Sequence, residues 1–289
     1  MTDASDHPLV VPETLEGWSL LHQFFRVDWS ALAGVSDHDR RHAADELSAW
    51  LTRWSGGDDG SSIAVAMLGH KSDVMLVHAR RTFDDLLQAQ LDISRLGVAG
   101  LLEATTSYVS VVELGMYDMT AKIHEQLVAQ GHQPGTDSYA DAKAEVMRTQ
   151  ATRVSGRLFT PFPARRYVCF YPMDKRRGEV KNWYQVPFEK RTRMMREHGM
   201  IGRTYAGTVT QIISGSIGFD DWEWGVDLFA DDPVVFKKLI YEMRFDEASA
   251  DYGEFGPFYV GMQFAASEVD AWLAGRVPRL VAPATALET

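Results

Sequence analysis

Two stretches of the chain repeat each other at a constant distance along the sequence. The segment "DVMLVHARRTFDDLLQAQLD" (73–92) matches "EWGVDLFADDPVVFKKLIYE" (223–242), an offset of 150 residues from position 73 to position 223. At the same offset, "YVSVVEL" (108–114) lies over "FYVGMQF" (258–264). Each stretch reads as a strand, a helix and another strand. Because the offset holds without a gap, we interpret the chain as an internal duplication.

The elements in front of these stretches also correspond. The segments "WSLLHQFF" (18–25) and "RRYVCFYP" (165–172) are apolar strand candidates. Each is followed by an amphipathic helical stretch, at 37–54 and at 186–199. Each half therefore has the order β-α-β-β-α-β, which predicts a ferredoxin-like α+β fold with both helices on one face of an antiparallel sheet. Two such sheets in one chain would form a dimeric-ferredoxin-like barrel.

The duplication divides the chain into two halves and a connector. We expect an N-terminal ferredoxin-like half at 15–114, a polar connector at 115–150 and a C-terminal half at 151–275. In the C-terminal half, alternating apolar residues predict a strand within 204–219, with Gln211 on the same face as the residues two places away. After a duplication, one half can keep a site that the other half has lost.

The composition argues against several classes of protein. A chain of 289 residues with a formal net charge of -11 lacks the positive surface that nucleic-acid binding requires. No apolar run predicts a membrane-spanning helix, and the polar N-terminus does not resemble a secretion signal. The one cysteine, Cys169, lies in an apolar strand and has no partner for a disulfide within the chain. These features are typical of a cytoplasmic protein.

A histidine near a helix end is the first candidate ligand. His198 lies in "MMREHGMIGR" (194–203), one turn after two methionines and directly before Gly199, which predicts the C-terminus of the helix. It is either a packed or capping histidine, or a ligand of haem iron on an apolar, Met-rich face. The sequence has no HExxH motif, Cys/His cluster, glycine-rich phosphate loop or nucleophile elbow that would favour another chemistry.

Cations cluster near predicted element ends in the C-terminal half. Lys175, Arg176 and Arg177 directly follow an apolar strand, and Arg157 and Arg244 lie near other strand or helix ends. A run of charges of this kind is ordinarily a solvated turn. Arginine also binds carboxylates well, so the same residues could form the rim of a site for an anionic ligand. The residues alone leave both interpretations open.

Several longer motifs occur in the order of a known family. They are "GWSLLHQFFRVDW" (17–29), "TTSYVSVVEL" (105–114), "FYPMDKRRGEVKNWY" (170–184), "HGMIGRTYAG" (198–207), "GSIGFDDWEWGVDLF" (215–229) and "YEMRFDEASADYGEFGPFYVG" (241–261). Together they resemble the coproheme decarboxylases of the chlorite dismutase-like superfamily. The resemblance spans residues 15–266 and leaves out much of the connector.

The resemblance implies a fold, an assembly and a reaction. It implies a dimeric-ferredoxin-like barrel with haem in the C-terminal half, assembled as a homopentamer. The reaction would be the hydrogen-peroxide-dependent oxidative decarboxylation of coproheme III to haem b, in which two propionates become vinyl groups through a monovinyl intermediate. It is the last step of coproporphyrin-dependent haem synthesis. A transient contact with the coproporphyrin ferrochelatase, which acts one step earlier, would fit this place.

The same resemblance implies roles for three residues. His198, in "EHGMIG", would be the proximal ligand of the iron. Tyr171, in "FYPMDK", would form the radical that abstracts hydrogen from the propionate β-carbon, and Lys175 would assist at the second propionate. In the absence of the surrounding motif, a packed strand aromatic would be the more ordinary interpretation of Tyr171.

Further residues match the binding site of the family. By resemblance, Arg157 and Arg244 would bind propionates, and Met173 and Trp183 would line the pocket. Ser249 and Tyr108 would add hydrogen bonds. By the same resemblance, Gln211 would lie on the distal side of the iron, and Glu247 would accept the ring N–H of His198. True chlorite dismutases carry a distal arginine at the position of Gln211, which argues against chlorite chemistry. The alternatives are a haem peroxidase or chlorite dismutase-like enzyme, and a non-catalytic haem-binding protein.

Overall fold

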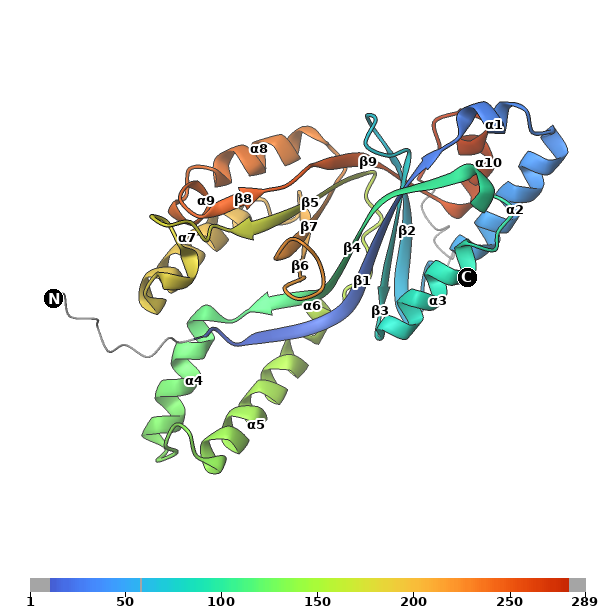
Figure 1. The fold of residues 1–289 in the computed structure, drawn as a ribbon. Coiled ribbons are helices and arrows are strands. Elements are labelled where there is room, and N and C mark those ends of the chain that lie inside the picture. The colour runs from blue at the N-terminus through green and yellow to red at the C-terminus, as the bar shows by residue number, and fades with distance from the viewer. Residues whose placement is uncertain (1–10, 58, 281–289) are drawn as a thin grey trace, which may run out of the picture.

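The computed structural model, which describes residues 11–57 and 59–280, contains the repeated element order predicted for each half (Figure 1). The first half contains β1 (Thr14–Val27), α1 (Trp29–Ala33), α2 (Asp37–Trp54), β2 (Gly60–Met67), β3 (Val74–Arg80), α3 (Phe83–Ile93) and β4 (Leu102–Gly115). The second half contains β5 (Tyr167–Lys175), α7 (Phe188–Thr204), β6 (Thr210–Gly215), β7 (Trp224–Ala230), α8 (Val234–Met243), α9 (Glu247–Ala250), β8 (Gly253–Phe255), β9 (Tyr259–Phe264) and α10 (Val269–Leu273). The matched strands β3 and β7 begin and end at the predicted offset.

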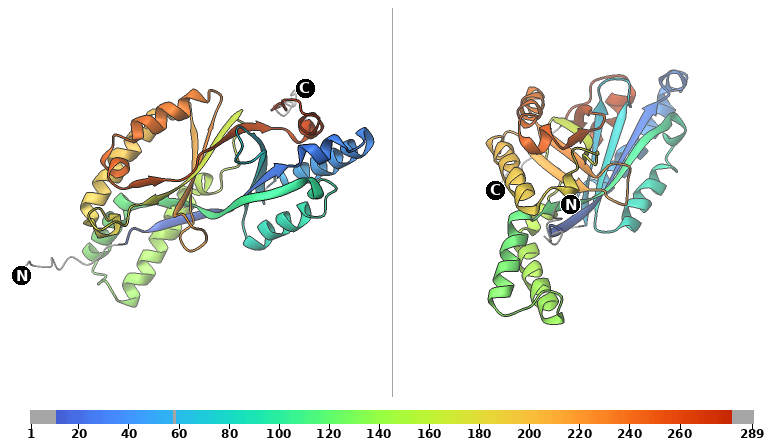
Figure 2. Two further views of the ribbon diagram at one scale, coloured as in Figure 1. Left: turned by 45° about the horizontal axis from the view of Figure 1, so that its top comes forward. Right: turned by 60° about the vertical axis from the view of Figure 1, so that its left-hand side comes forward.

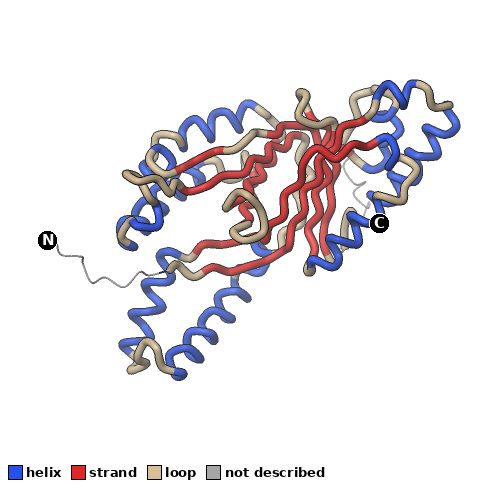
Figure 3. The backbone as a smooth tube through the Cα atoms, in the orientation of Figure 1, coloured by secondary structure: helices blue, strands red, loops and turns tan. Residues whose placement is uncertain are grey.

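The strands form two ferredoxin-like sheets that join into one barrel (Figure 3). The order β4-β1-β3-β2 in the first half corresponds to β9-β5-β7-β6 in the second, and all of these pairs are antiparallel. Pairing of β2 with β9 and of β4 with β6 closes the sheet on itself. The α+β fold class with two ferredoxin-like halves is therefore confirmed. Our division of the chain at 15–114, 115–150 and 151–275 remains a proposal.

The alternation of side chains along each strand separates two kinds of core. Val77 of β3 and Phe170 of β5 belong to a buried cluster that fills the barrel interior. Their neighbours Leu76 and Cys169 point to the opposite face and pack in clusters under the helices. The interior is tightly filled, because a Cβ atom on Gly225 would lie 2.7 Å from the ring of Tyr108. The barrel interior is thus a packed core and not a ligand cavity.

The helices cover the two sheets differently, and this difference positions the site. Helix α2 buries Ala43, Leu47, Trp50 and Leu51, an i, i+4, i+7, i+8 stripe that packs on the first sheet. Helix α7 occupies the equivalent place in the second half. Among its described residues, only Arg191 and Met194 are buried. The second half therefore leaves its sheet face less completely covered than the first.

Two boundaries in the second half differ from the prediction. Gly199 does not end its helix, because α7 continues to Thr204, so that His198 lies inside the helix and not in its last turn. The residue with the left-handed backbone that reverses the chain is Gly207, at a φ of 83°. The predicted strand at 204–219 is shorter than expected, since β6 covers only Thr210–Gly215 and a turn follows it. A glycine signals a possible helix end but cannot enforce one.

The connector folds into a helical hairpin. Helices α4 (Tyr117–Ala129) and α5 (Asp137–Arg153) extend away from the barrel, and the short helix α6 (Ser155–Leu158) leads back to it (Figure 2). Helix α5 has no buried residue, which agrees with the polar composition of this segment. Within residues 11–57 and 59–280, no helix is both long and apolar enough to cross a membrane.

Candidate functional site

His198 is held by a buried aspartate. Its Nδ1 atom lies 2.9 Å from Oδ2 of Asp246, and the side chain of Asp246 is almost fully buried. Asp246 also accepts hydrogen bonds from the backbone N–H and the hydroxyl of Ser249, both at 3.0 Å, and so caps α9. Burial by itself raises the pKa of Asp246, but the hydrogen bonds from His198 and Ser249 outweigh it and hold the pKa below its usual value. The carboxylate therefore stays ionised.

This contact leaves one imidazole nitrogen available. With Nδ1 committed to Asp246, Nε2 of His198 has no hydrogen-bond partner in the described part of the chain, and the side chain is 26% exposed. His198 lies one turn before Ile201, which packs against the helix-covered core of the second sheet. A histidine whose second nitrogen is fixed by a carboxylate has the arrangement of a metal ligand. Among the residues described, no group of three His, Cys, Asp or Glu side chains could hold a bare ion. A histidine held in this way also has the arrangement of an axial ligand of haem iron.

The residue next to Asp246 has a different function from the one expected. Glu247 lies 2.9 Å from the ammonium of Lys190 and 2.8 Å from the guanidinium of Arg193. Glu247 therefore does not accept the ring N–H of His198, and this expectation was wrong. The reason is local: Asp246 is the N-cap residue whose side chain turns back over the start of α9, whereas Glu247 lies in the first turn and faces the exposed cations of α7.

Tyr171 lies on the helix-covered face of β5. It pairs with Val226 of β7, which in turn pairs with Ile213 of β6, so these three side chains share one face. Its ring stacks on Phe258 at a centroid distance of 4.6 Å, and the side chain is almost fully buried. Burial raises the pKa of the Tyr171 phenol well above its usual value. The phenol is thus protonated at neutral pH.

Lys175 is a buried cation near the end of the same strand. Its ammonium donates a hydrogen bond to the carbonyl of Ala248 at 3.0 Å and lies 4.7 Å from the ring centre of Trp183. Burial lowers the pKa of Lys175 to about 8, although the more distant charges of Asp246 and Glu223 oppose this shift. No carboxylate in the described part of the chain forms an ion pair with it. A buried ammonium without a counter-ion is suited to receive the carboxylate of a ligand.

The segment from Arg244 to Ser249 connects these three residues. Asp246 bonds His198, and the carbonyl of Ala248 accepts from Lys175. The guanidinium of Arg244 lies 4.7 Å above the ring of Phe255, which is itself 5.9 Å from the ring of Tyr171. Arg244 is exposed and forms no ion pair with the residues described, so its charge is available to a ligand. One short stretch between α8 and β8 therefore contacts His198 and Lys175 directly and is linked to Tyr171 through Phe255.

The sheet face beside this segment carries the predicted lining residues. Gln211 of β6 is exposed opposite Leu228, and Met173 of β5 is opposite Trp224 of β7. Trp224 was not among the predicted site residues; its indole N–H donates to Glu113 at 3.4 Å. Burial raises the pKa of Glu113. The duplication indicates that β5 pairs with β7. The register of this pair, which places Trp224 beside Met173, would have identified Trp224 as a site residue.

Trp183 leads to another residue that the sequence analysis missed. It is buried against Tyr252 at a ring distance of 5.4 Å, and Tyr117 of α4 lies 6.4 Å from it. Tyr117 also stacks on Phe188 at the start of α7. The connector therefore contributes an aromatic residue to this side of the barrel. No local sequence signal identifies such a contact, because Tyr117 and Trp183 are far apart in the chain.

The structure does not bring every predicted residue to this place. Tyr108 points into the barrel interior, where its hydroxyl contacts that of Ser216, on the opposite sheet face from Tyr171. Arg157 is exposed on α6 and forms no hydrogen bond through its side chain within the described residues. Ser249 lies beside His198 but directs its hydroxyl to Asp246. Of the predicted set, Tyr108 is thus on the opposite sheet face from Tyr171.

The remaining cations of the motif at 170–184 are paired at the surface. Arg176 lies 3.0 Å from Glu254, and Arg177 lies 3.6 Å from Glu223. The exposed pair of Arg176 and Glu254 contributes little to stability, whereas the exposed Arg177 contacts a buried Glu223. The charge run that follows β5 thus divides into Lys175, which is buried at the site, and two arginines that form an ordinary ion-paired turn.

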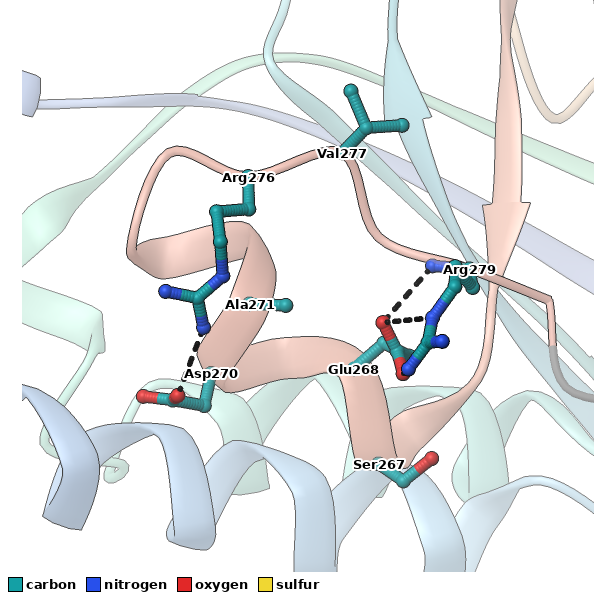
Figure 4. A pocket seen from close by; sticks show the side chains of 7 residues that line it. All are labelled: Ser267, Glu268, Asp270, Ala271, Arg276, Val277 and Arg279. Carbon is teal, nitrogen blue, oxygen red and sulfur yellow. Dashed lines mark hydrogen bonds and ion pairs between the residues drawn. The ribbon is translucent and has the colours of Figure 1, made fainter.

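A separate hollow lies at the other end of the molecule. It has a volume of about 420 Å³ and is lined by Ser267, Glu268, Asp270, Ala271, Arg276, Val277 and Arg279 (Figure 4). Its arginines are occupied, since Arg279 contacts Glu268 at 2.8 Å and Arg276 contacts Asp270 at 3.5 Å. With its cations neutralised, this hollow is a weaker candidate for an anionic ligand than the site around Arg244 and Lys175.

Comparison with known proteins relates the chain to a family. Residues 40–264 match the chlorite dismutase family. A protein from Staphylococcus saprophyticus named coproheme decarboxylase is 43% identical over 86% of this chain and 93% of that protein. A relative from Natronomonas pharaonis, named as a candidate haem-binding protein, is 42% identical, and the chain spans 42% of its length. A similar relative from Haloquadratum walsbyi is 41% identical, with 48% of its length covered. The chain thus spans less than half of these two relatives.

Solved structures support the same assignment. A structure described as a heme-binding protein from Thermus thermophilus superimposes with a TM-score of 0.79 at 39% identity and covers 93% of this chain and 99% of that one. A mutant chlorite dismutase from Candidatus Nitrospira defluvii has a TM-score of 0.67 at 18% identity, over 90% of this chain and 97% of that one, which shows a common fold. With its duplicated ferredoxin-like barrel and its match over most of its length, the chain belongs to the chlorite dismutase family.

Proposed function

We propose that this chain is a coproheme decarboxylase that converts coproheme III to haem b with hydrogen peroxide. The observation that carries the proposal is that one segment, from Arg244 to Ser249, contacts His198 and Lys175 and is linked to Tyr171 through Phe255. The identity to a relative with that name supports the same substrate. The porphyrin iron of the substrate would supply the redox chemistry with peroxide, and the protein would supply binding and orientation.

The reaction balances for each propionate separately. The side chain loses carbon dioxide and two hydrogen atoms and becomes a vinyl group, while one hydrogen peroxide takes up the two hydrogens and leaves as two waters. His198 would hold the iron through Nε2, with Asp246 keeping the proton on Nδ1. The phenol of Tyr171 would first lose a hydrogen atom in the oxidation by peroxide, and the phenoxyl radical would then take a hydrogen atom from the propionate β-carbon, which requires close contact with the propionate. Lys175 and Arg244 would hold propionate carboxylates.

Two further expectations belong to this proposal. Gln211, on the exposed sheet face, would lie on the distal side of the iron, where chlorite-degrading relatives use an arginine, and this difference disfavours chlorite chemistry. Met173 and Trp183 would pack against the porphyrin. Tyr108, which points into the barrel interior, is not included in the binding set, whereas Arg157 would bind a propionate, as the resemblance implies. A non-catalytic haem carrier would have no use for a buried, unpaired Lys175 on the same strand as a buried Tyr171.

The cellular setting is also part of the proposal. We place the protein in the cytoplasm as a homopentamer that completes coproporphyrin-dependent haem synthesis. The single, buried Cys169, which is typical of a reducing compartment, supports this location. The coproporphyrin ferrochelatase, which would supply coproheme, is the expected transient partner.

The test is a single-turnover experiment on the loaded protein. Protein is loaded with coproheme without oxygen, hydrogen peroxide is added in steps, and the porphyrin is identified by mass spectrometry. We expect two successive losses of carbon dioxide plus two hydrogens. Tyr171→Phe should bind coproheme with an unchanged absorption spectrum but yield almost no product. Tyr167→Phe, four residues earlier on the same face of β5, is the matched control and should react normally. Normal conversion by Tyr171→Phe would contradict the proposed role.

A further inference from the structure

A carboxyl group of the first half reaches the sheet of the second half. Strand β4 pairs with β6 at Val111 and Val112, and Glu113 follows directly after them. The carboxyl of Glu113 lies against Gly215 at the end of β6, because a Cβ atom added to this glycine would collide with Oε2 of Glu113. Any side chain at position 215 would therefore displace the carboxyl. The absence of a side chain on β6 makes room for an acid from β4.

The strand register places this carboxyl on the face of the candidate site. Gly215 pairs with Trp224 of β7, which pairs with Met173 of β5, two residues after Tyr171. Because side chains alternate along a strand, these positions share the face of Tyr171. Two strand spacings separate Gly215 from Met173, a width of about 10 Å. A tetrapyrrole that packs on Met173 and carries propionates around its edge spans this width and reaches Glu113.

The two oxygens of Glu113 have different surroundings. Oε1 accepts a hydrogen bond from the indole N–H of Trp224 at 3.4 Å. Oε2, which lies over Gly215, has no hydrogen-bond partner within residues 11–57 and 59–280, and the carboxyl has no ion-pair partner there. When the carboxyl is protonated, Oε2 is therefore the oxygen that can carry the proton and donate it to a ligand.

The groups around Glu113 favour its neutral form. Burial is the largest influence and raises the pKa of Glu113. The hydrogen bond from Trp224 opposes this shift, whereas the negative charge of Glu16, the residue directly opposite on β1, adds to it. Tyr117 of α4 is the other titratable group close by, and burial raises the pKa of its phenol, so that it brings no charge at neutral pH. An acid without a counter-ion, beside a second acid, holds its proton more tightly than usual.

We propose that Glu113 is a further substrate-binding residue, whose neutral carboxyl donates a hydrogen bond from Oε2 to a propionate of the bound porphyrin. A hydrogen bond from a neutral acid to a carboxylate is charge-assisted and strong. Lys175 and Arg244 would meet propionates with a positive charge, whereas Glu113 would do so only while it is protonated. Once ionised, it has no donor and repels the ligand. The inference rests on the proposed function, because it takes coproheme as the ligand.

Coproheme titrations at several pH values test this inference. As the pH rises through the pKa of Glu113, the wild type should lose about tenfold in affinity, which is the contribution of one hydrogen bond to a charged group. Glu113→Gln keeps an acceptor for Trp224 and has a donor that does not titrate, so it should not show this loss. Glu113→Leu has no donor and should bind about tenfold more weakly than the wild type on the acid side.

The control is a carboxyl on the same strand. Glu103→Gln, at an exposed position of β4, should follow the wild type at every pH. The propionates of the ligand and His198 titrate in all of these proteins, so the difference between the wild type and Glu113→Gln isolates Glu113. Circular dichroism checks that each variant is folded.

Infrared difference spectra of the ligand-free protein provide a second readout. The band of a protonated carboxyl should be present in the wild type and absent in Glu113→Gln. In Glu16→Gln, the same band should disappear at a lower pH, because removal of the charge of Glu16 lowers the pKa of Glu113. Absence of the band at the pH where coproheme binds most tightly would overturn the inference.

The outcomes separate this inference from the proposed function. An equal pH dependence of coproheme affinity in Glu113→Gln and in the wild type would overturn the role of Glu113 alone, provided that both proteins bind and convert coproheme. A wild type that does not bind coproheme would overturn both. Conversion with hydrogen peroxide, measured on the same samples, tests the reaction independently.

Discussion

Replacing Lys175 with methionine is predicted to stabilise the ligand-free protein. Burial lowers the pKa of this ammonium from 10.5 to about 8, while the charges of Asp246 and Glu223 only partly oppose the shift. A pKa lowering of this size means that burial of the charged ammonium destabilises the folded protein by about 3 kcal/mol. Methionine fills a similar volume without a charge. The hydrogen bond to Ala248 is lost, which costs about 1 kcal/mol. The net gain at neutral pH is thus about 2 kcal/mol.

The gain should depend on pH in a defined direction. Because the pKa of Lys175 is lower in the folded protein, the unfolded chain binds more protons between about pH 8 and about pH 10.5. The penalty of the buried charge is therefore full below about pH 8 and is relieved as the pH rises towards 10.5. The stability difference between Lys175→Met and the wild type should shrink by about 2 kcal/mol between about pH 7 and about pH 10.

Urea unfolding followed by circular dichroism measures this difference. Lys122→Met, at an exposed position on α4, is the matched control and should show a difference close to zero at both pH values. The same Lys175→Met protein should bind coproheme more weakly and accumulate the singly decarboxylated product. A variant no more stable than the wild type at neutral pH, or a gain that does not change with pH, would refute the view that Lys175 is held charged at a cost to stability.

Two other substitutions test the polar contacts. Asp246→Asn should lower the free energy of unfolding by about 1 kcal/mol above the acid range. This loss should fade as the pH falls through the lowered pKa of Asp246, because protonation then removes the same charge in the wild type. Thermal melts at several pH values measure the loss, and a loss that persists in acid would contradict the ionised carboxylate. Inside the barrel, Asp227→Val leaves His22, which lies 3.0 Å away in the wild type, without its acceptor and should cost about 3 kcal/mol in urea unfolding. Adding His22→Phe should recover much of this loss, and an additive pair of effects would contradict the coupling.

Much of the architecture follows from the sequence. The repeat at a fixed offset predicts two β-α-β-β-α-β halves, and β3 and β7 lie where the offset places them. The motif at 170–184 identifies Tyr171 and Lys175, and both side chains are buried, but their roles stay predictions. The predictions of the fold succeed because strand alternation and helix periodicity are local properties, and because a duplicated topology restricts how the halves can pair.

Other features depend on contacts between distant segments. Alternation shows that Tyr108 and Val109 face opposite ways, but only closure of the barrel decides that Tyr108 faces the interior. The resemblance suggested Glu247 as the acceptor for His198, whereas the turn before α9 presents Asp246. Gly199 signalled a helix end, yet α7 continues past it. These outcomes depend on contacts between segments that are far apart in the chain, whose free energies can exceed the local preferences of a single residue.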